Sequence, residues 1–247
     1  MIGYAPETQS IAERLQSPTL AHPLGTDAFG RDVLARLLAG GRVSLLIGVL
    51  SMAITVGAGV LVGALSGFAG GKVDALLMRA TELVMVFPTF FLIILVVASF
   101  GGSVPLLILV IGLTSWPVAA RIVRGEVLKI RAREYVLAAR AIGASPARVL
   151  TRHVVPALAA VVIVSATIRV GTNILIEAGL SYLGLGVQPP LASWGNMVAD
   201  GAKVMRTEWW LTAIPALAIF GTVFVFNLLG ESLRDASDPR LALGRRR

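Results

Sequence analysis

The side chains that could perform covalent chemistry in this sequence form two small groups. Asp27 and Asp32 both lie in the segment GTDAFGRD, and two neighbouring carboxyl groups can act as a general acid and a general base. Ser181, in GLSYLG, would be a nucleophile only with a base beside it. Aspartates beside Gly and Thr more often cap turns and helix starts, so capping is the favoured interpretation for both. Asp32 is also spaced to pair with Arg36 at i,i+4.

Metal and nucleotide chemistry have little support in the sequence. The chain contains no cysteine, and its two histidines, His22 and His153, lie far apart, so no metal-ligand cluster is indicated. The run Gly70-Gly71-Lys72 invites a phosphate-loop interpretation, but the pattern GxxxxGK(S/T) is incomplete because residue 73 is Val. We therefore expect no catalytic residue, no metal site and no cofactor in this chain, and we expect that it does not bind ATP itself.

The composition places these residues in a membrane protein. Hydrophobic residues make up 56% of the chain and charged residues only 15%, and the mean hydropathy is +0.82. A soluble chain of 247 residues could not bury so many apolar side chains. Because lipid offers no hydrogen-bond partners to open backbone groups, the spans should be helices. The sequence predicts an all-α polytopic bundle.

Five apolar runs are each near the ~20 residues that are needed to cross a bilayer. They cover residues 43–70, 83–100, 104–120, 157–176 and 211–229. Ahead of them, residues 30–42 have the pattern of a short amphipathic helix, which we expect to lie at the membrane surface. Its apolar face would carry Val33, Leu34, Leu37 and Leu38.

Basic residues fix the direction of the spans. Eight of the 22 lysines and arginines fall between Arg121 and Arg152, and such clusters beside apolar runs mark the cytoplasmic side. Counting crossings from a cytoplasmic loop at 121–156 puts residues 1–42 and 177–210 outside and the basic tail at 234–247 inside. The permease-like core of spans then covers residues 43–233. This placement of charge also argues against nucleic-acid binding.

The same crossing count has two consequences. It puts His153 and Ser181 on opposite sides of the membrane, so no nucleophile–base pair remains for an intramembrane serine enzyme. It also leaves residues 1–42 outside, although they carry no export signal. We therefore expect about 20 further apolar residues upstream of this sequence, which would form a first span.

Other residues within the spans carry hypotheses about packing and transport. Gly59, Gly63 and Gly67 recur every four residues, a stripe typical of close helix packing. Arg169 and Glu177 are ionisable residues in or at the end of the fourth run, and such residues usually face a pathway or a buried partner. Tryptophans 194, 209 and 210 are typical of an interfacial belt.

The most informative segment is EYVLAARAIGASPARVLTRHVVP, from Glu134 to Pro156. Its first part favours a helix, Gly143 and Pro146 interrupt it, and residues 148–155 can resume it, so a helix–turn–helix hairpin is predicted. Such a hairpin can dock in a groove of another protein. Left to itself, a basic amphipathic loop is more often a membrane-surface element that contacts lipid headgroups.

Four stretches together resemble the permeases of ABC importers for dipeptides, oligopeptides and nickel. They are the loop just described, HPLGTD with GRD at residues 22–32, EAGLSYLGLG at 177–186, and PP with SWG at 189–195. They occur in the family's order and spacing, and the resemblance covers about residues 4–242. Leu137 departs from the family by replacing the signature glutamate of its loop, which puts a docking salt bridge from that position in doubt.

The resemblance implies a type I importer fold, with five spans here against six in the family, in the inner membrane of a prokaryote. It implies that the loop docks on one or two separate ATPase subunits, which bind the ATP and Mg²⁺. It also implies a second permease subunit and an extracytoplasmic substrate-binding protein as partners. The coupling residues implied are Tyr135, Ala138, Ala139, Arg140, Gly143, Ala144, Ser145, Pro146 and Arg148.

The cargo and two other functional classes remain open at this stage. The motifs are shared by peptide permeases and nickel permeases, so they do not separate these cargoes. A self-contained secondary carrier is an alternative, although such proteins usually show internal repeats, and none is evident here. An intramembrane enzyme would need a reactive cluster on one side of the membrane.

Overall fold

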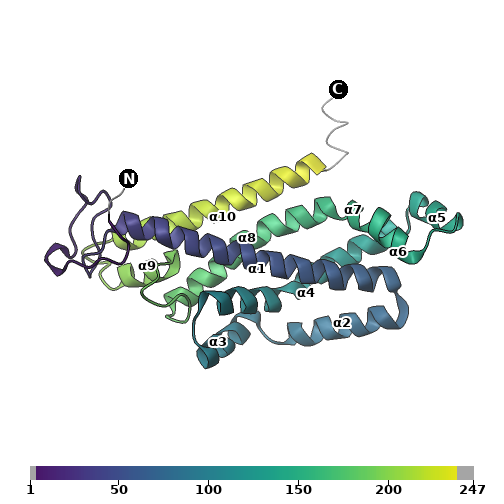
Figure 1. The fold of residues 1–247 in the computed structure, drawn as a ribbon, viewed down its shortest axis with the longest axis horizontal. Coiled ribbons are helices and arrows are strands. Elements are labelled where there is room, and N and C mark those ends of the chain that lie inside the picture. Colours follow the sequence, from purple (N-terminus) through teal and green to yellow (C-terminus); the bar gives the residue numbers. More distant parts are fainter. Residues whose placement is uncertain (1–3, 238–247) are drawn as a thin grey trace, which may run out of the picture. The chain divides into compact units, whose positions relative to one another are not determined.

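The computed structural model describes residues 4–237, and this range contains no β-strand beyond an isolated bridge between Thr26 and Asp32. Figure 1 follows the helices along the chain. The α-helices are α1 (Val33–Ala69), α2 (Gly71–Val86), α3 (Thr89–Phe100), α4 (Val104–Arg131), α5 (Glu134–Ala141), α6 (Pro146–Val149), α7 (Val155–Ala157), α8 (Ala159–Tyr182), α9 (Trp194–Ala202) and α10 (Trp210–Ser237). A 3₁₀ turn, Ile11–Glu13, and a π-helical turn, Leu150–Val154, complete them. The predicted all-α class is confirmed.

Four helices are long and apolar enough to cross a membrane, namely α1, α4, α8 and α10. The helices α2 and α3 pass the same test only together, and they are bent by 73° at the break between them. The described residues therefore contain four candidate spans, or five if the bent pair counts as one. The chain is a multi-pass membrane protein.

The predicted straight span over residues 83–100 differs from the structure. Helix α2 ends at Val86, Phe87 is extended, and α3 begins after Pro88. Proline lacks the N–H that continues a helix, and it disfavours the helical conformation of the residue before it, so the apolar run breaks there.

The predicted surface helix at residues 30–42 is not a separate element. Helix α1 runs without interruption from Val33 to Ala69 and joins it to the first apolar run. Val33 and Leu37 pack against Met197 of α9 and Leu211 of α10 in a small apolar core. Of the predicted apolar face, these contacts bury Val33 and partly cover Leu37, whereas Leu38 stays exposed. Helix α4 similarly extends to Arg131, beyond the predicted end of its apolar run at residue 120.

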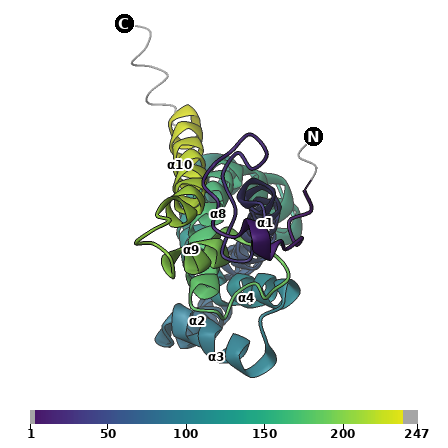
Figure 2. The same cartoon turned by 90° about the vertical axis from the view of Figure 1, so that its left-hand side faces the viewer.

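Contacts within the chain divide it into two compact units. Unit 1 comprises residues 1–51, 93–110 and 170–225, and unit 2 comprises residues 52–92, 111–169 and 226–247. Figure 2 views the chain from the side on which the N-terminal segment, α9 and the start of α1 lie, all of them in unit 1. Unit 2 contains the predicted hairpin. The predicted basic tail falls mostly at residues 238–247, outside the described residues.

Candidate functional site

The hairpin in unit 2 is built from α5 and α6 and the turn between them. Gly143 adopts a φ of +85°, which ends α5 in the left-handed conformation. The N–H of Gly143 donates to the carbonyl of Arg140 at 3.0 Å, and the N–H of Ala144 donates to the carbonyl of Ala139 at 3.0 Å. This bond pair is a Schellman motif. Ser145 then caps α6, and its Oγ accepts from the N–H of Arg148 at 3.4 Å.

One face of the hairpin is anchored in an apolar core of unit 2. Val136 of α5, Val149 of α6 and Val154 of the π-helical turn are fully buried there. They pack with Val127 and Ile130 from the end of α4. Each fully buried aliphatic side chain of this kind contributes roughly 1.5–3 kcal/mol. The hairpin is therefore held on the helices of unit 2 and not attached only at its two ends.

The opposite face of the hairpin exposes apolar side chains. Tyr135 and Leu137 on α5 are exposed, and Ile142 at its end is 87% exposed. A contiguous exposed apolar patch is a feature of protein or membrane interaction sites. Arg140, Arg148 and Arg152 add positive charge around it, and none of them forms a salt bridge with any described residue.

Two arginines connect the hairpin region to the end of α1 within unit 2. The guanidinium of Arg140 lies over the ring of Phe68, 5.1 Å from its centroid. Nη1 of Arg131 donates to the carbonyls of Gly67 and Phe68 at 3.2 and 3.0 Å. These carbonyls belong to the last turn of α1, which has no intrahelical donors for them. A cation at a helix C-terminus is also favourable for the helix dipole.

A charged pair fixes α2 against α4 nearby. Arg124 donates from Nε and Nη2 to the two oxygens of Asp74, each at 2.6 Å, in a bidentate pair. Ser66 Oγ also donates to Asp74. The turn from α1 to α2 is thus tied to α4 by directional bonds.

The predicted glycine stripe lies where α1 packs on α4. A Cβ at Gly63 would come within 2.8 Å of Val123 Cβ, and one at Gly67 would lie 2.9 Å from Val127 Cβ. Gly59 faces Ala119 in the same way. The backbones approach so closely that no larger residue fits without displacement.

Glu177 lies in a polar network inside unit 1. It has no exposed surface, and its two oxygens accept bonds from Ser44 Oγ at 2.8 Å and from Ser181 Oγ at 2.6 Å. Ser181 Oγ in turn accepts from the N–H of Val187 at 3.0 Å. The network therefore joins α1, α8 and the loop that follows α8. Ser181 serves as a hydrogen-bond bridge there, and among the described residues its side chain bonds Glu177 and the N–H of Val187 and no histidine.

Trp194 is also buried in unit 1, so its predicted place in an interfacial belt was wrong. Its Nε1 donates to the carbonyl of Leu37 at 3.0 Å, and its ring packs against Gly41 of α1. Its N–H donates to Ser44 Oγ at 3.3 Å. Trp209, in contrast, is exposed and forms an edge-to-face pair with Trp210.

The two aspartates of the GTDAFGRD segment act as caps in the structure. Asp27 Oδ1 accepts from the N–H of Phe29 at 2.8 Å and from the N–H of Arg31 at 3.1 Å. Asp32 Oδ1 accepts from the N–H of Ala35 at 2.7 Å and so caps the start of α1. The favoured capping interpretation is confirmed.

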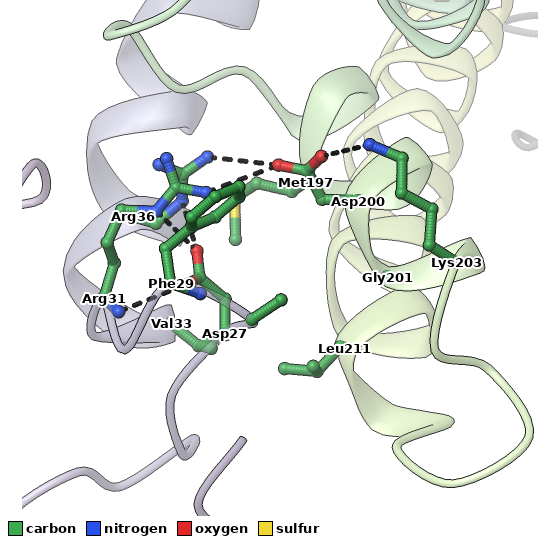
Figure 3. Close-up of a pocket in the computed structure, with 11 residues that line it drawn as sticks. Asp27, Phe29, Arg31, Val33, Arg36, Met197, Asp200, Gly201, Lys203 and Leu211 are labelled. Carbon is green, nitrogen blue, oxygen red and sulfur yellow. Dashed lines mark hydrogen bonds and ion pairs between the residues drawn. The ribbon is translucent and has the colours of Figure 1, made fainter. Parts of the chain in front are cut away.

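The side-chain partners of these aspartates differ from the predicted ones. Asp32 Oδ2 lies 2.9 Å from Nδ1 of His22 and not against Arg36. Arg36 instead lies near Asp27 and Asp200, which arrives from α9. Figure 3 shows this charged cluster. Asp200 could not be predicted as a partner, because it is distant along the chain and belongs to no motif.

The structure brings the nine predicted coupling residues together on one hairpin. Ala138 is exposed and Ala139 is buried. Arg169 lies half-buried in the part of α8 that belongs to unit 2. Sequence reasoning missed Phe68, Asp74 and Arg124, which carry contacts that only packing creates.

Comparison with known proteins identifies the family. Residues 59–243 match the family model described as binding-protein-dependent transport system inner membrane component. The chain belongs to this family. It is an ABC importer permease of the peptide type, and the predicted resemblance is confirmed.

The permease has curated relatives along most of its length. It is 43% identical over 226 residues to the oligopeptide transport system permease protein OppC of Haemophilus influenzae, covering 91% of this chain and 73% of the relative. It is 43% identical over 219 residues to OppC of Escherichia coli K12, covering 89% and 72%. It is 40% identical over 238 residues to OppC of Bacillus subtilis, covering 96% and 78%.

Solved structures support the same fold. A chain of the inward-facing MetNI methionine ABC transporter matches the permease with a TM-score of 0.68 at 17% identity, covering 81% of this chain and 95% of that chain. A chain of an amino acid ABC transporter solved with histidines matches with a TM-score of 0.62 at 15% identity, covering 82% and 94%. At such identities the likeness concerns the fold alone.

Proposed function

We propose that this permease moves di- or oligopeptides across the inner membrane of a prokaryote, driven by a separate cytoplasmic ATPase that docks on the α5–α6 hairpin. The observation that carries the proposal is the two-sided hairpin. Val136 and Val149 hold one face on the bundle, while Leu137 and Ile142 expose apolar surface on the other. A rigid, anchored element of this kind can transmit a push or a pull to the spans on either side.

The mechanism that we propose is a shift of population between two arrangements of the spans. ATP binding would close two ATPase subunits, and the docked hairpins of this permease and of a second permease subunit would move with them. An extracytoplasmic binding protein would deliver the peptide. This chain would supply the pathway and the lever, with no covalent step, and ATP and Mg²⁺ would be held by the ATPase.

Peptides are favoured over a nickel chelate as cargo because the relatives at 40–43% identity are peptide or oligopeptide permeases by name. A cargo route needs residues that face it. Arg169, half-buried in a span, remains our proposal for a pathway residue. Glu177 is enclosed in its network, so a pathway role for it would need the network to open.

The test is reconstitution of the complete transporter in liposomes. The permease would be combined with its second permease, its ATPase subunits and its binding protein, with ATP enclosed on the cytoplasmic side. We expect uptake of a labelled tripeptide that stops when ATP or the ATPase is left out, and no binding of ATP by the permease chain alone. Uptake that proceeds without the ATPase would instead establish a secondary carrier. Uptake of ⁶³Ni²⁺ but not of peptide would reverse the choice of cargo.

A further inference from the structure

Two cavities in unit 1 share a wall of charged side chains. The smaller cavity has a volume of about 110 Å³, and the larger has a volume of about 560 Å³. Both are lined by Arg31, Arg36, Asp200 and Lys203. Figure 3 shows these residues around the smaller cavity, with α9 contributing Asp200 and the start of α1 contributing Arg36.

Arg36 is poorly paired for a buried cation. It is almost fully buried, its Nε lies 3.5 Å from Asp27, and its Nη2 lies 3.9 Å from Asp200. Charge-assisted bonds are normally ~2.7–2.9 Å long. Its Nη1 is buried and has no hydrogen-bond partner among the described residues. A buried donor without an acceptor is unfavourable, so an added oxygen acceptor would be stabilised there.

The charges that line the smaller cavity also favour an anion. Three cations, Arg31, Arg36 and Lys203, face two carboxylates, Asp27 and Asp200. Arg31 is already bonded to Asp27, with Nε 2.7 Å from Oδ2. Lys203 bonds Asp200 at 3.0 Å through one of its three hydrogens and is otherwise exposed. Glu7 adds negative charge at longer range but lines neither cavity.

The rest of the small cavity is apolar. Phe29, Val33, Met197 and Leu211 line it beside the charged wall. An apolar cavity of ~150 Å³ admits benzene, so a space of this size suits one aliphatic side chain. The larger cavity lies within the ~300–1,000 Å³ typical of small-ligand sites, and Tyr182, Gln188 and Asn196 give it polar groups.

We propose that these cavities bind the C-terminal residue of a peptide that has a free carboxylate. The carboxylate would accept bonds from the guanidinium of Arg36, which lines both cavities, and from Lys203, and the last side chain would fill the small apolar cavity. The preceding residues would lie in the larger cavity. The proposal rests on the proposed function, since it assigns a receiving site for the same class of cargo to unit 1.

The experiment measures binding of labelled tripeptides to the full chain in lipid nanodiscs, without the binding protein. Ala-Ala-Leu carries the label on its amino terminus and is compared with its C-terminal amide and with Ala-Ala-Gly. We expect saturable binding of the free acid, and affinity at least about tenfold lower for the amide, as expected from losing a hydrogen bond between charged groups. Ala-Ala-Gly should bind more weakly than Ala-Ala-Leu, because it leaves the apolar cavity empty.

Two lysines provide a matched pair of variants. The side chains of Lys203 and Lys129 are 74% and 73% exposed, and each bonds a carboxylate three residues earlier at 3.0 Å. Lys203→Gln should weaken binding of the acid by about threefold or more, as for a partly exposed charged bond, whereas Lys129→Gln should not. Arg36→Gln should lower the affinity at least about tenfold. If that variant does not fold, the peptide series and the lysine pair still decide.

Several results would overturn the proposal. They are no saturable binding of the acid, equal affinity for acid and amide, or identical behaviour of the two lysine variants. If Lys203→Gln weakened docking of the binding protein while no free peptide bound, the charged wall would be a contact surface for that protein instead. Efficient ATP-driven uptake of Ala-Ala-Leu without binding at this site would reject only this inference. Absence of uptake by the complete transporter would reject the proposed function.

Discussion

Gly143 allows the stability of the hairpin turn to be tested separately from the proposed docking of the ATPase. Its φ of +85° is unfavourable for any residue with a Cβ, yet a Cβ there would meet no atom within 4 Å. Replacement by alanine therefore adds only backbone strain, about 1–2 kcal/mol. That amounts to a factor of roughly 5–30 in the population of the native turn.

Gly143→Trp adds the same backbone strain as the alanine variant. Its indole begins in open space, because a Cβ at this position meets no atom of the chain within 4 Å. If the ATPase covers this turn, the indole must be accommodated in a packed interface, at a cost of about 1–3 kcal/mol beyond the alanine variant. We expect Gly143→Trp to bind the ATPase about 5–150-fold more weakly than Gly143→Ala. The difference between the two variants reports the docking surface alone.

The assay titrates fluorescent ATPase onto the permease in nanodiscs and follows both affinity and ATP hydrolysis. Gly184→Trp is the matched control, because Gly184 has a φ of +78°, also has open space around it, and lies in unit 1. It should leave ATPase affinity unchanged. Thermal unfolding of each variant checks that the bundle is intact. Equal affinity of Gly143→Trp and Gly143→Ala would refute the assignment of this turn to the docking surface.

Three further perturbations test the packing that supports the two units. Gly63→Leu should lower the free energy of unfolding by about 1–3 kcal/mol, because its Cβ would enter the packed contact between α1 and α4. Gly57→Leu, on the open face of the same helix, should not, and equal effects in thermal unfolding would contradict the stripe. Glu177→Ala should cost about 1–3 kcal/mol, because the hydroxyl hydrogens of two buried serines lose their acceptor. Glu177→Gln should cost less because it keeps one acceptor oxygen. Chemical denaturation measures both variants, and equal stability of the two would argue against the network. Asp74→Asn should destabilise the chain by about 1–2 kcal/mol through loss of its bidentate pair, whereas Glu126→Gln should have little effect because its partner Lys129 is largely exposed. A larger loss for Glu126→Gln would show that the ranking of these two pairs is wrong.

The hairpin illustrates how far local sequence reaches. The turn could be predicted because Gly143 and Pro146 each impose a backbone constraint that is independent of distant residues. The exposed and buried faces of α5 could not be assigned in the same way. Ala138 and Ala139 are identical residues, and only the position of the underlying core decides that the second is buried.

The polar networks also separate contacts that local sequence predicts from contacts that depend on distant residues. Capping by Asp27 and Asp32 followed from their neighbours, because a cap bonds to N–H groups a few residues away. Their side-chain partners did not follow, since Asp200 approaches only after α9 has packed on the start of α1. The prediction for Trp194 failed for the same reason. A tryptophan near a span favours the membrane interface, but here the ring is buried against Gly41 of α1, a contact that the local sequence does not reveal.

A bundle of apolar helices with a basic, glycine-interrupted hairpin could be predicted from the residues alone, because hydrophobic run length and local backbone constraints act without any tertiary contact. The family could also be predicted, because four motifs occur in the order and spacing that the family shows. Three features came from the packed fold: α1 begins before the first apolar run, Pro88 breaks the second, and Arg36, which lines two cavities, has a nitrogen without a hydrogen-bond partner among the described residues. These features depend on contacts between residues far apart in the chain, and such contacts exist only once the helices have packed.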